Sequence, residues 1–304
     1  MPTDRTTEFL RELLVRQLTT WLPAALHRSR RATIAVAGAD AGSAEAALRL
    51  VATHGDQVRG RQVTVLVLAD PDANADPGPN AGTDLPARLG PIEAELPAEV
   101  TVHLLPGDAY RLPVAVKAAG AAGAPLFSFV DLPGAVTPKL LTAATNGRTG
   151  ELLLHISESA RAALVSAGFP LVAEVATVLP ESPAAGVVAF GSRSDRSLEA
   201  VRDALWAVGA EFAVRYGDPL DPTGTTVDVV NDPDMEPLAH ELLAELRAGG
   251  SRPVTELRRH ALTATVYRAA HVNQALADLL DAGVLRRDRE SGRLAGDETI
   301  TLAR

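Results

Sequence analysis

Residues 31–53 read RATIAVAGADAGSAEAALRLVAT, and this stretch decides the fold. Its first part contains Thr33, Ile34 and Val36, and this apolar, β-branched run predicts a short buried strand. The run stops at residues 38–42, and apolar residues then return at helical spacing behind Ser43, a residue type that favours a helix N-cap. The stretch therefore predicts a strand, a tight glycine-containing turn and a helix.

The predicted turn has the features of a ligand-binding loop. Gly38, Asp40 and Gly42 lie in it, and such a turn brings backbone N–H groups close to a nucleotide at the carboxyl edge of an open α/β sheet. The spacing Gly-x-x-x-Gly matches neither the dinucleotide motif Gly-x-Gly-x-x-Gly nor a phosphate loop that ends in Lys-Ser/Thr. We therefore treat these three residues as candidate cofactor-binding residues, with a purely structural turn as the alternative.

The composition limits the class of protein. The chain has 304 residues, 46% of them hydrophobic, which is enough for a large core and favours two domains. A net charge of -9 excludes a basic surface over the whole protein, although a small basic face is compatible with it. There is no cysteine and no long apolar run, and the first residues lack the pattern of a signal peptide. We expect a cytoplasmic protein without disulfides or membrane spans.

Short apolar strands alternate with helical patterns through the first half of the chain. An amphipathic helix is expected at residues 8–21, and a loop at residues 72–84. Five strand–helix repeats predict a doubly wound, mostly parallel sheet of Rossmann-like type. A sixth strand is expected at residues 186–190 and a seventh at 211–216 or 226–230. The five repeated strands are expected at residues 34–37, 63–68, 100–104, 126–130 and 152–156.

The composition changes near residue 236. Three helical patterns follow, at residues 238–247, 254–261 and 266–282, and then a two-stranded ribbon that bends at residues 291–292. Three helices and a ribbon are typical of a winged helix-turn-helix module. We therefore predict a Rossmann-like domain over residues 1–235 and a winged helix domain over residues 236–304.

Four aspartates follow the first four predicted strands, where ligands of doubly wound sheets lie. Asp70 is placed to accept hydrogen bonds from a ribose diol, with a turn-capping role as the alternative. The carboxylate of Asp108 suits either of two roles: it accepts a hydrogen bond from a purine amino group, or it caps the helix that follows. Asp131 ends a very apolar strand, where a carboxylate is costly unless it is hydrogen-bonded or functional, so it is the candidate catalytic residue.

Other site chemistries find little support. The seven histidines are scattered without metal-ligand spacing, so no metal site is expected. No Gly-x-Ser-x-Gly motif is present, which weakens a hydrolase interpretation. His155 is interpreted as a hydrogen-bonded histidine of the fifth strand rather than as a base.

The predicted winged helix carries polar residues of the types that read nucleic acid. Arginine, asparagine and glutamine bind base edges, and arginines on a wing suit phosphates or a minor groove. Nearby acidic residues dilute the positive charge, so a protein-docking role is the alternative. The candidates for binding DNA, RNA or a partner protein are Arg268, Asn273, Gln274, Arg286 and Arg287.

Four segments resemble the three-Cys-motif partner proteins, a bacterial family. They are LTTWL at 18–22, the first loop with Gly42-Ser43, FSFVDLPG at 127–134, and SLEAVRDALWAVGAEFAVRY at 197–216; the tail at 254–285 is also similar. The resemblance implies a class I methyltransferase-type, seven-stranded sheet that binds S-adenosylmethionine. It also implies a partner protein encoded by a neighbouring gene.

The resemblance assigns roles to the candidate residues. Gly38 and Gly42 would shape the cofactor loop, Asp70 would hold the ribose, Asp108 would contact the adenine, and Asp131 would orient the substrate nucleophile. This chain departs from the family in the first loop, which lacks the leading acid, and in Asp-Leu-Pro-Gly at 131–134. Two functions therefore stay open: an S-adenosylmethionine-dependent methyltransferase that acts on or near nucleic acid, and a non-catalytic DNA- or protein-binding module on a decayed methyltransferase fold.

Overall fold

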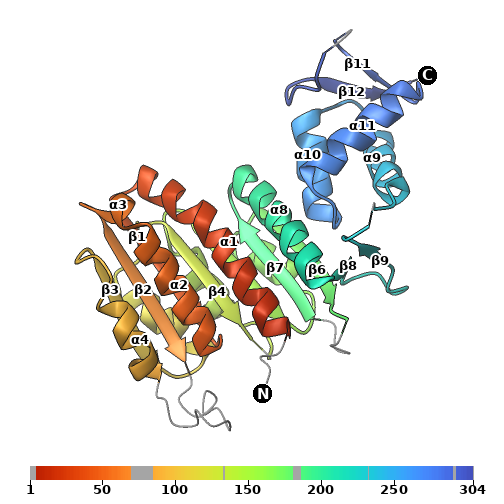
Figure 1. Cartoon of the computed structure of the whole chain (residues 1–304). Helices are drawn as coiled ribbons and strands as arrows, with labels where there is room; N and C mark the ends of the chain where they lie inside the picture. The colour runs from red at the N-terminus through yellow and green to blue at the C-terminus, as the bar shows by residue number, and fades with distance from the viewer. Residues whose placement is uncertain are drawn as a thin grey trace.

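The structure is a computed structural model of the chain, drawn in Figure 1. No helix in the described part of the chain is long and apolar enough to cross a membrane. The structure describes residues 5–69, 85–132, 134–180, 186–231, 233–289 and 292–303.

The larger part of the molecule is built on one mixed, mostly parallel sheet. Its described strands lie in the order β3-β2-β1-β4-β5-β7-β6-β8-β9. The first five are mutually parallel, and β7 lies antiparallel between β5 and β6. The strands are β1 (Arg31–Ala37), β2 (Gln62–Ala69), β3 (Val100–Pro106), β4 (Leu126–Asp131), β5 (Gly150–Ile156), β6 (Leu171–Val178), β7 (Gly186–Ser192), β8 (Arg215–Gly217) and β9 (Thr226–Asp228).

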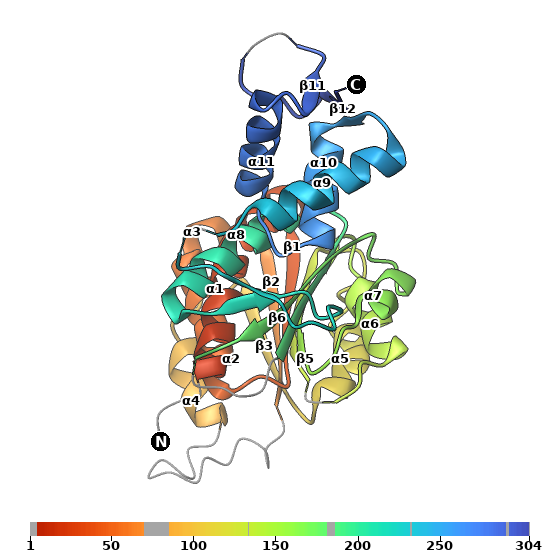
Figure 2. The ribbon, with the colours of Figure 1, turned by 90° about the vertical axis from the view of Figure 1, so that its right-hand side faces the viewer.

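Helices cover both faces of this sheet, as Figure 2 shows. One face carries α1 (Arg5–Arg28), α2 (Ala41–Thr53), α4 (Leu85–Glu93) and α8 (Asp195–Phe212), with the short α3 (Gly55–Val58) beside them. The other face carries α5 (Leu112–Ala118), α6 (Pro138–Thr145) and α7 (Arg161–Ser166). A short 3-10 helix, η1 (Ala109–Arg111), precedes α5.

The central strands are buried on both sides, which explains their apolar sequences. In β1, Ile34 and Val36 belong to the core under α1 and α2, whereas Ala35 and Ala37 belong to the core under α5 and α6. Successive side chains of a strand point to opposite faces, so a strand covered on both faces is apolar throughout.

The C-terminal part of the chain, from residue 236 on, forms a smaller helical unit beside α8 and β6 (Figures 1 and 2). Its elements are α9 (Glu236–Gly249), β10 (Arg252–Pro253), α10 (Val254–Ala264), α11 (Ala269–Asp281), β11 (Leu285–Arg287) and β12 (Thr299–Leu302). The three strands form an antiparallel sheet in the order β10-β12-β11. We refer to residues 236–303 as the C-terminal unit.

The predicted α/β architecture with a mostly parallel sheet is confirmed, with two corrections. Among the described residues the large sheet has nine strands rather than seven, and β6 is a strand that the sequence pattern did not predict. Its Glu174 interrupts an apolar run, but this carboxylate is buried and accepts hydrogen bonds from the Ser159 hydroxyl at 2.7 Å and the Ala160 N–H at 2.8 Å. The predicted loop at 72–84 lies outside the described residues.

Candidate functional site

The chain reverses its path through the sheet between β1 and β4. From β1 it continues outward to β2 and β3, and then returns to β4 and β5 on the other side of β1. Ligands of open α/β sheets bind outside the carboxyl ends of the strands at such a switch point. The loops after β1 and β4 border this position, so we call the carboxyl ends of β1–β5 the switch-point edge.

Gly38 allows the two bordering loops to touch. Its φ of +72° is in the left-handed region, and a Cβ at this position would lie 2.2 Å from the carbonyl oxygen of Asp131. A side chain cannot occupy that space, so this predicted cofactor-loop residue is required by the backbone geometry.

Backbone hydrogen bonds fix the remaining loops of this edge. The N–H of Gly38 donates to Leu68 at 3.1 Å, and that of Gly107 donates to Ala69 at 2.9 Å. The N–H of Leu132 donates to the carbonyl of His155, also at 2.9 Å. The loops after β1, β3 and β4 are therefore each bound to the end of a neighbouring strand.

Asp40 caps α2 and is paired with a cation. Its carboxylate accepts hydrogen bonds from the N–H groups of Gly42 at 2.8 Å and Ser43 at 3.1 Å. The guanidinium of Arg11 donates to Oδ2 at 2.8 Å. Asp40 is thus the N-cap, and the expectation that Ser43 has this role is wrong because α2 starts two residues earlier.

Gly42 makes room for Arg11 above the first loop. A Cβ at Gly42 would lie 2.5 Å from a terminal nitrogen of the Arg11 guanidinium. Arg11 comes from α1, whose packing beside α2 brings its side chain to the loop. Nothing local in the sequence links Arg11 to residues 38–42, so its place beside the first loop is not predictable from the sequence.

Asp108 and Tyr110 lie after β3. Asp108 is exposed, and its Oδ1 accepts the N–H of Tyr110 at 3.0 Å, so it caps η1. The Tyr110 hydroxyl donates to the carbonyl of Ala135 at 3.0 Å, which connects the loops after β3 and β4. The Tyr110 side chain is 41% exposed at this edge, and the sequence analysis missed it.

Asp131 is held by His155. Nδ1 of His155 lies 2.9 Å from Oδ1 of Asp131, and the two residues are opposite one another in adjacent parallel strands. The other ring nitrogen faces Gly186, where a Cβ would approach to 2.4 Å. His155 is therefore hydrogen-bonded within the sheet and also orients Asp131, whose Oδ2 accepts no hydrogen bond from the described residues.

Two further predictions from the sequence concern the ribose ligand and a metal site. Asp70, the predicted ribose ligand, lies outside the described residues. Across the parts of the chain that the structure covers, no group of three or more His, Asp or Glu side chains is arranged to hold a metal ion.

The C-terminal unit is joined to α8 by buried polar contacts, which we call the α8 interface. Arg202 is fully buried and donates from Nε and Nη2 to the carbonyl of Leu262 at 3.0 and 2.8 Å. Burial lowers the pKa of Arg202 to about 9. The indole N–H of Trp206 donates to Val266 at 2.9 Å, so α8 binds the end of α10 and the turn that follows it.

Arg268 and His271, at the start of α11, also face α8. The Arg268 guanidinium carbon lies 5.6 Å from the Trp206 ring centre, a distance suited to a cation–π contact. The rings of His271 and Trp206 are edge to face at 4.3 Å. Arg268, a predicted nucleic-acid ligand, therefore contacts the larger part of this same chain.

Of the other predicted binding residues of the C-terminal unit, Asn273, Arg286 and Arg287 line one groove, and Gln274 is exposed on α11. Asn273 accepts a hydrogen bond from Arg258 at 2.7 Å, and Gln274 donates to Asp278 at 2.8 Å. Nε of Arg287 lies 2.6 Å from the buried carboxylate of Glu298, inside the ribbon. Arg286 is exposed.

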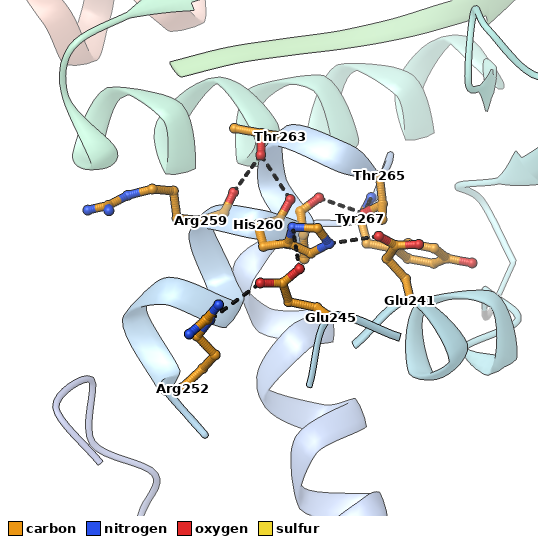
Figure 3. Close-up of polar contacts among 9 residues, drawn as sticks. Glu241, Glu245, Arg252, Arg259, His260, Thr263, Thr265 and Tyr267 are labelled. Atoms are coloured by element: carbon orange, nitrogen blue, oxygen red, sulfur yellow. Dashed lines mark hydrogen bonds and ion pairs between the residues drawn. The ribbon is translucent and has the colours of Figure 1, made fainter. Parts of the chain in front are cut away.

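Figure 3 shows the polar contacts that hold α9, α10 and the following turn together. His260 of α10 lies between two carboxylates of α9, 2.7 Å from Glu241 and 3.7 Å from Glu245. Thr265 accepts the N–H of Tyr267 at 3.2 Å and so shapes the turn before α11. These contacts give the C-terminal unit a defined shape, and their role is structural.

Comparisons with known proteins give distant structural similarities. No family model matches the chain, and no curated protein matches it. A predicted O-methyltransferase from Agrobacterium tumefaciens is similar at 15% identity and a TM-score of 0.34, over 60% of this chain and 81% of that one. The tRNA methyltransferase TrmK from B. subtilis is similar at 13% identity and a TM-score of 0.33, over 88% and 93%. A methyltransferase from Geobacter sulfurreducens is similar at 14% identity and a TM-score of 0.31, over 64% and 82%.

These TM-scores are low, so the fold assignment depends on the strand order itself. The described strands lie in the order β3-β2-β1-β4-β5-β7-β6-β8-β9, which is a doubly wound, mostly parallel sheet with β7 antiparallel to its neighbours. The resemblance to the three-Cys-motif partner family stays a prediction.

Proposed function

We propose that the switch-point edge binds S-adenosylmethionine and that the protein is a methyltransferase of this fold type. The observation that carries the proposal is the contact between the two loops at the β1/β4 switch point, through Gly38 and the Asp131 backbone. This is the position where doubly wound sheets hold nucleotide-like ligands.

The described residues fit such a ligand. Asp108 keeps a carboxylate oxygen that accepts no hydrogen bond from the described residues, which suits the amino and hydroxyl donors of an adenosyl group. Arg11 supplies a cation beside the first loop, which suits a carboxylate. The cofactor, when bound, supplies an electrophilic methyl group.

The residues of the chain orient and align rather than transfer protons. His155 fixes Oδ1 of Asp131 and leaves Oδ2 to hold the substrate nucleophile. Methyl transfer depends on alignment and exclusion of water more than on acid–base groups, so one oriented carboxylate is sufficient.

The alternative is a non-catalytic binding protein, and Arg11 favours it. The ion pair between Arg11 and Asp40 covers the first loop, where a cofactor would approach. In this alternative the C-terminal unit, with the element order of a winged helix, carries the function. Winged helices contact nucleic acid or proteins, and the exposed Arg286 and Gln274 support a nucleic-acid contact.

Titration calorimetry with S-adenosylmethionine and S-adenosylhomocysteine tests the proposal. Binding should be weakened by Asp108→Asn, because this change removes a carboxylate at the edge, and by Asp70→Ala, the residue that the sequence predicts as the ribose ligand. The matched control is Asp56→Asn in α3, whose carboxylate is exposed away from these loops. No heat and no thermal shift up to millimolar ligand would refute cofactor binding and favour the non-catalytic alternative.

A further inference from the structure

We infer that the groove between α11 and β11, which Arg289 and residues 292–294 also line, docks an acidic amphipathic helix of a partner protein. The groove has a volume of about 750 Å³ and lies at the end of α11 farthest from α8 (Figure 2). The inference is independent of cofactor binding at the switch-point edge.

Two side chains at the start of α11 are occupied by contacts within the chain. Winged helix proteins that read duplex DNA insert the start of this helix into the major groove. Here Arg268 and His271 pack on Trp206, so these two side chains face α8 of the same chain. Within the described residues, the second half of α11 makes no such contact with α8 and forms one wall of the groove.

The floor of the groove is apolar. Ala277 and Leu280 contribute from α11, Leu285 from β11, and Leu294 from the ribbon. Leu280 and Leu294 are only half-buried, so they present apolar surface to the groove. An apolar groove beside a helix accepts the apolar face of an amphipathic helix.

The rim of the groove selects the charge of the occupant. Arg287 is paired with Glu298 and Arg289 with Asp297, at 2.6 and 2.8 Å. Arg286 and Arg293 are exposed and form no ion pair with described residues. They provide two free cations beside an apolar floor.

Two free cations suit a peptide better than a nucleic acid. Nucleic-acid binding through the phosphate backbone commonly uses about 6–10 phosphate contacts. Asp281 also lines the groove, and the chain as a whole has a net charge of -9. Two carboxylates flanking an apolar stripe match this surface, whereas a long polyanion would meet too few arginines.

Fluorescence anisotropy with synthetic helices tests the inference on the full chain. The probe is a labelled peptide of about 18 residues with leucine on one face and glutamate on the others, long enough to form a helix when bound. Its matched control has lysine in place of glutamate. The glutamate peptide should bind, and Arg286→Glu with Arg293→Glu should weaken it at least about tenfold and improve binding of the lysine peptide.

The control variant is Arg30→Glu with Arg148→Glu, two exposed arginines of the larger part, and it should leave binding unchanged. Both double variants should unfold at the wild-type temperature and titrate with S-adenosylmethionine as the wild type does. Failure of the wild type to prefer the glutamate peptide, or equal losses in both double variants, would overturn the inference. Tighter, salt-sensitive binding of a single- or double-stranded oligonucleotide that is lost in the groove variant would reassign the groove to nucleic acid.

Discussion

The switch-point edge and the α8 interface are both polar, but they use their polar groups differently. At the edge, Asp108 and Asp131 each have one carboxylate oxygen engaged by a neighbour and one that is not. At the interface, Arg202 and Trp206 are buried and donate to backbone carbonyls of the C-terminal unit. The edge therefore keeps hydrogen-bonding capacity for a ligand, and the interface uses its capacity to join two parts of one chain.

The largest effect is expected at the interface. Arg202→Ala should lower the free energy of unfolding by about 4 kcal/mol, because it leaves the buried carbonyl of Leu262 without this donor and a cavity where the fully buried side chain packed. Arg259→Ala removes a two-bond contact to Asp195 on the exposed rim and should cost about 1 kcal/mol or less. Urea unfolding measures both. Equal losses of unfolding free energy in the two variants would show that burial does not make the Arg202 contacts more stabilising than the Arg259 contacts.

A pH-dependent effect is expected at Glu151, which is buried between α1 and α8. Desolvation raises its pKa to about 7 from a usual 4.5, although the Ser197 hydroxyl donates to it at 2.6 Å. As the pH rises, the unfolded state therefore loses the proton of Glu151 at a lower pH than the folded state does. The free energy of unfolding should fall as the pH rises from about 4.5 to about 7, by at most about 3 kcal/mol.

Glu151→Gln should remove this slope and make the protein more stable than the wild type at pH 8. Unfolding measured across this pH range provides the test, with the exposed Glu95→Gln as the control. A slope that persists in Glu151→Gln would assign the effect to another group.

The edge itself is tested by two glycines with nearly equal φ values. Gly38 and Gly60 have φ of +72° and +73°, but only Gly38 has backbone within reach of an added Cβ. Gly60→Ala should cost about 1 kcal/mol from the left-handed conformation alone. Gly38→Ala should cost about 2 kcal/mol more, because the methyl group meets the Asp131 carbonyl. Equal thermal shifts would contradict the loop contact on which the proposed function depends.

The smallest effect on stability is expected at Asp108. Asp108→Ala removes the cap of η1 and should cost about 1 kcal/mol, whereas Asp108→Asn keeps an acceptor and should cost less. If the edge is a ligand site, both variants should nevertheless weaken cofactor binding. A change in stability without a change in binding would make Asp108 a structural cap only.

The sequence predicted those features that depend on neighbouring residues. Alternation of apolar strands and helices located β1 to β5, and the glycines of the first loop indicated its turn. The cap of α2 was assigned to Ser43 instead of Asp40 because both residue types favour that position, and only the backbone decides between them.

Features that depend on distant residues could not be predicted. Arg11 is 29 positions before Asp40, and only the packing of α1 beside α2 brings them together. The pairing of Asp131 with His155 follows from the register of β4 and β5, which periodicity does not specify. The contact of Arg268 with Trp206 likewise requires the position of the C-terminal unit.

The packing of α1 between α2 and α8 has a consequence for synthesis on the ribosome. Phe9 meets Phe212 at a ring distance of 6.0 Å, so part of the apolar face of α1 obtains its partner only after about 200 further residues have been made. Until α8 emerges, that face of the nascent chain is open to chaperones and to other unfinished chains. Closure of the α1–α8 seam is therefore a late event in the life of the growing polypeptide.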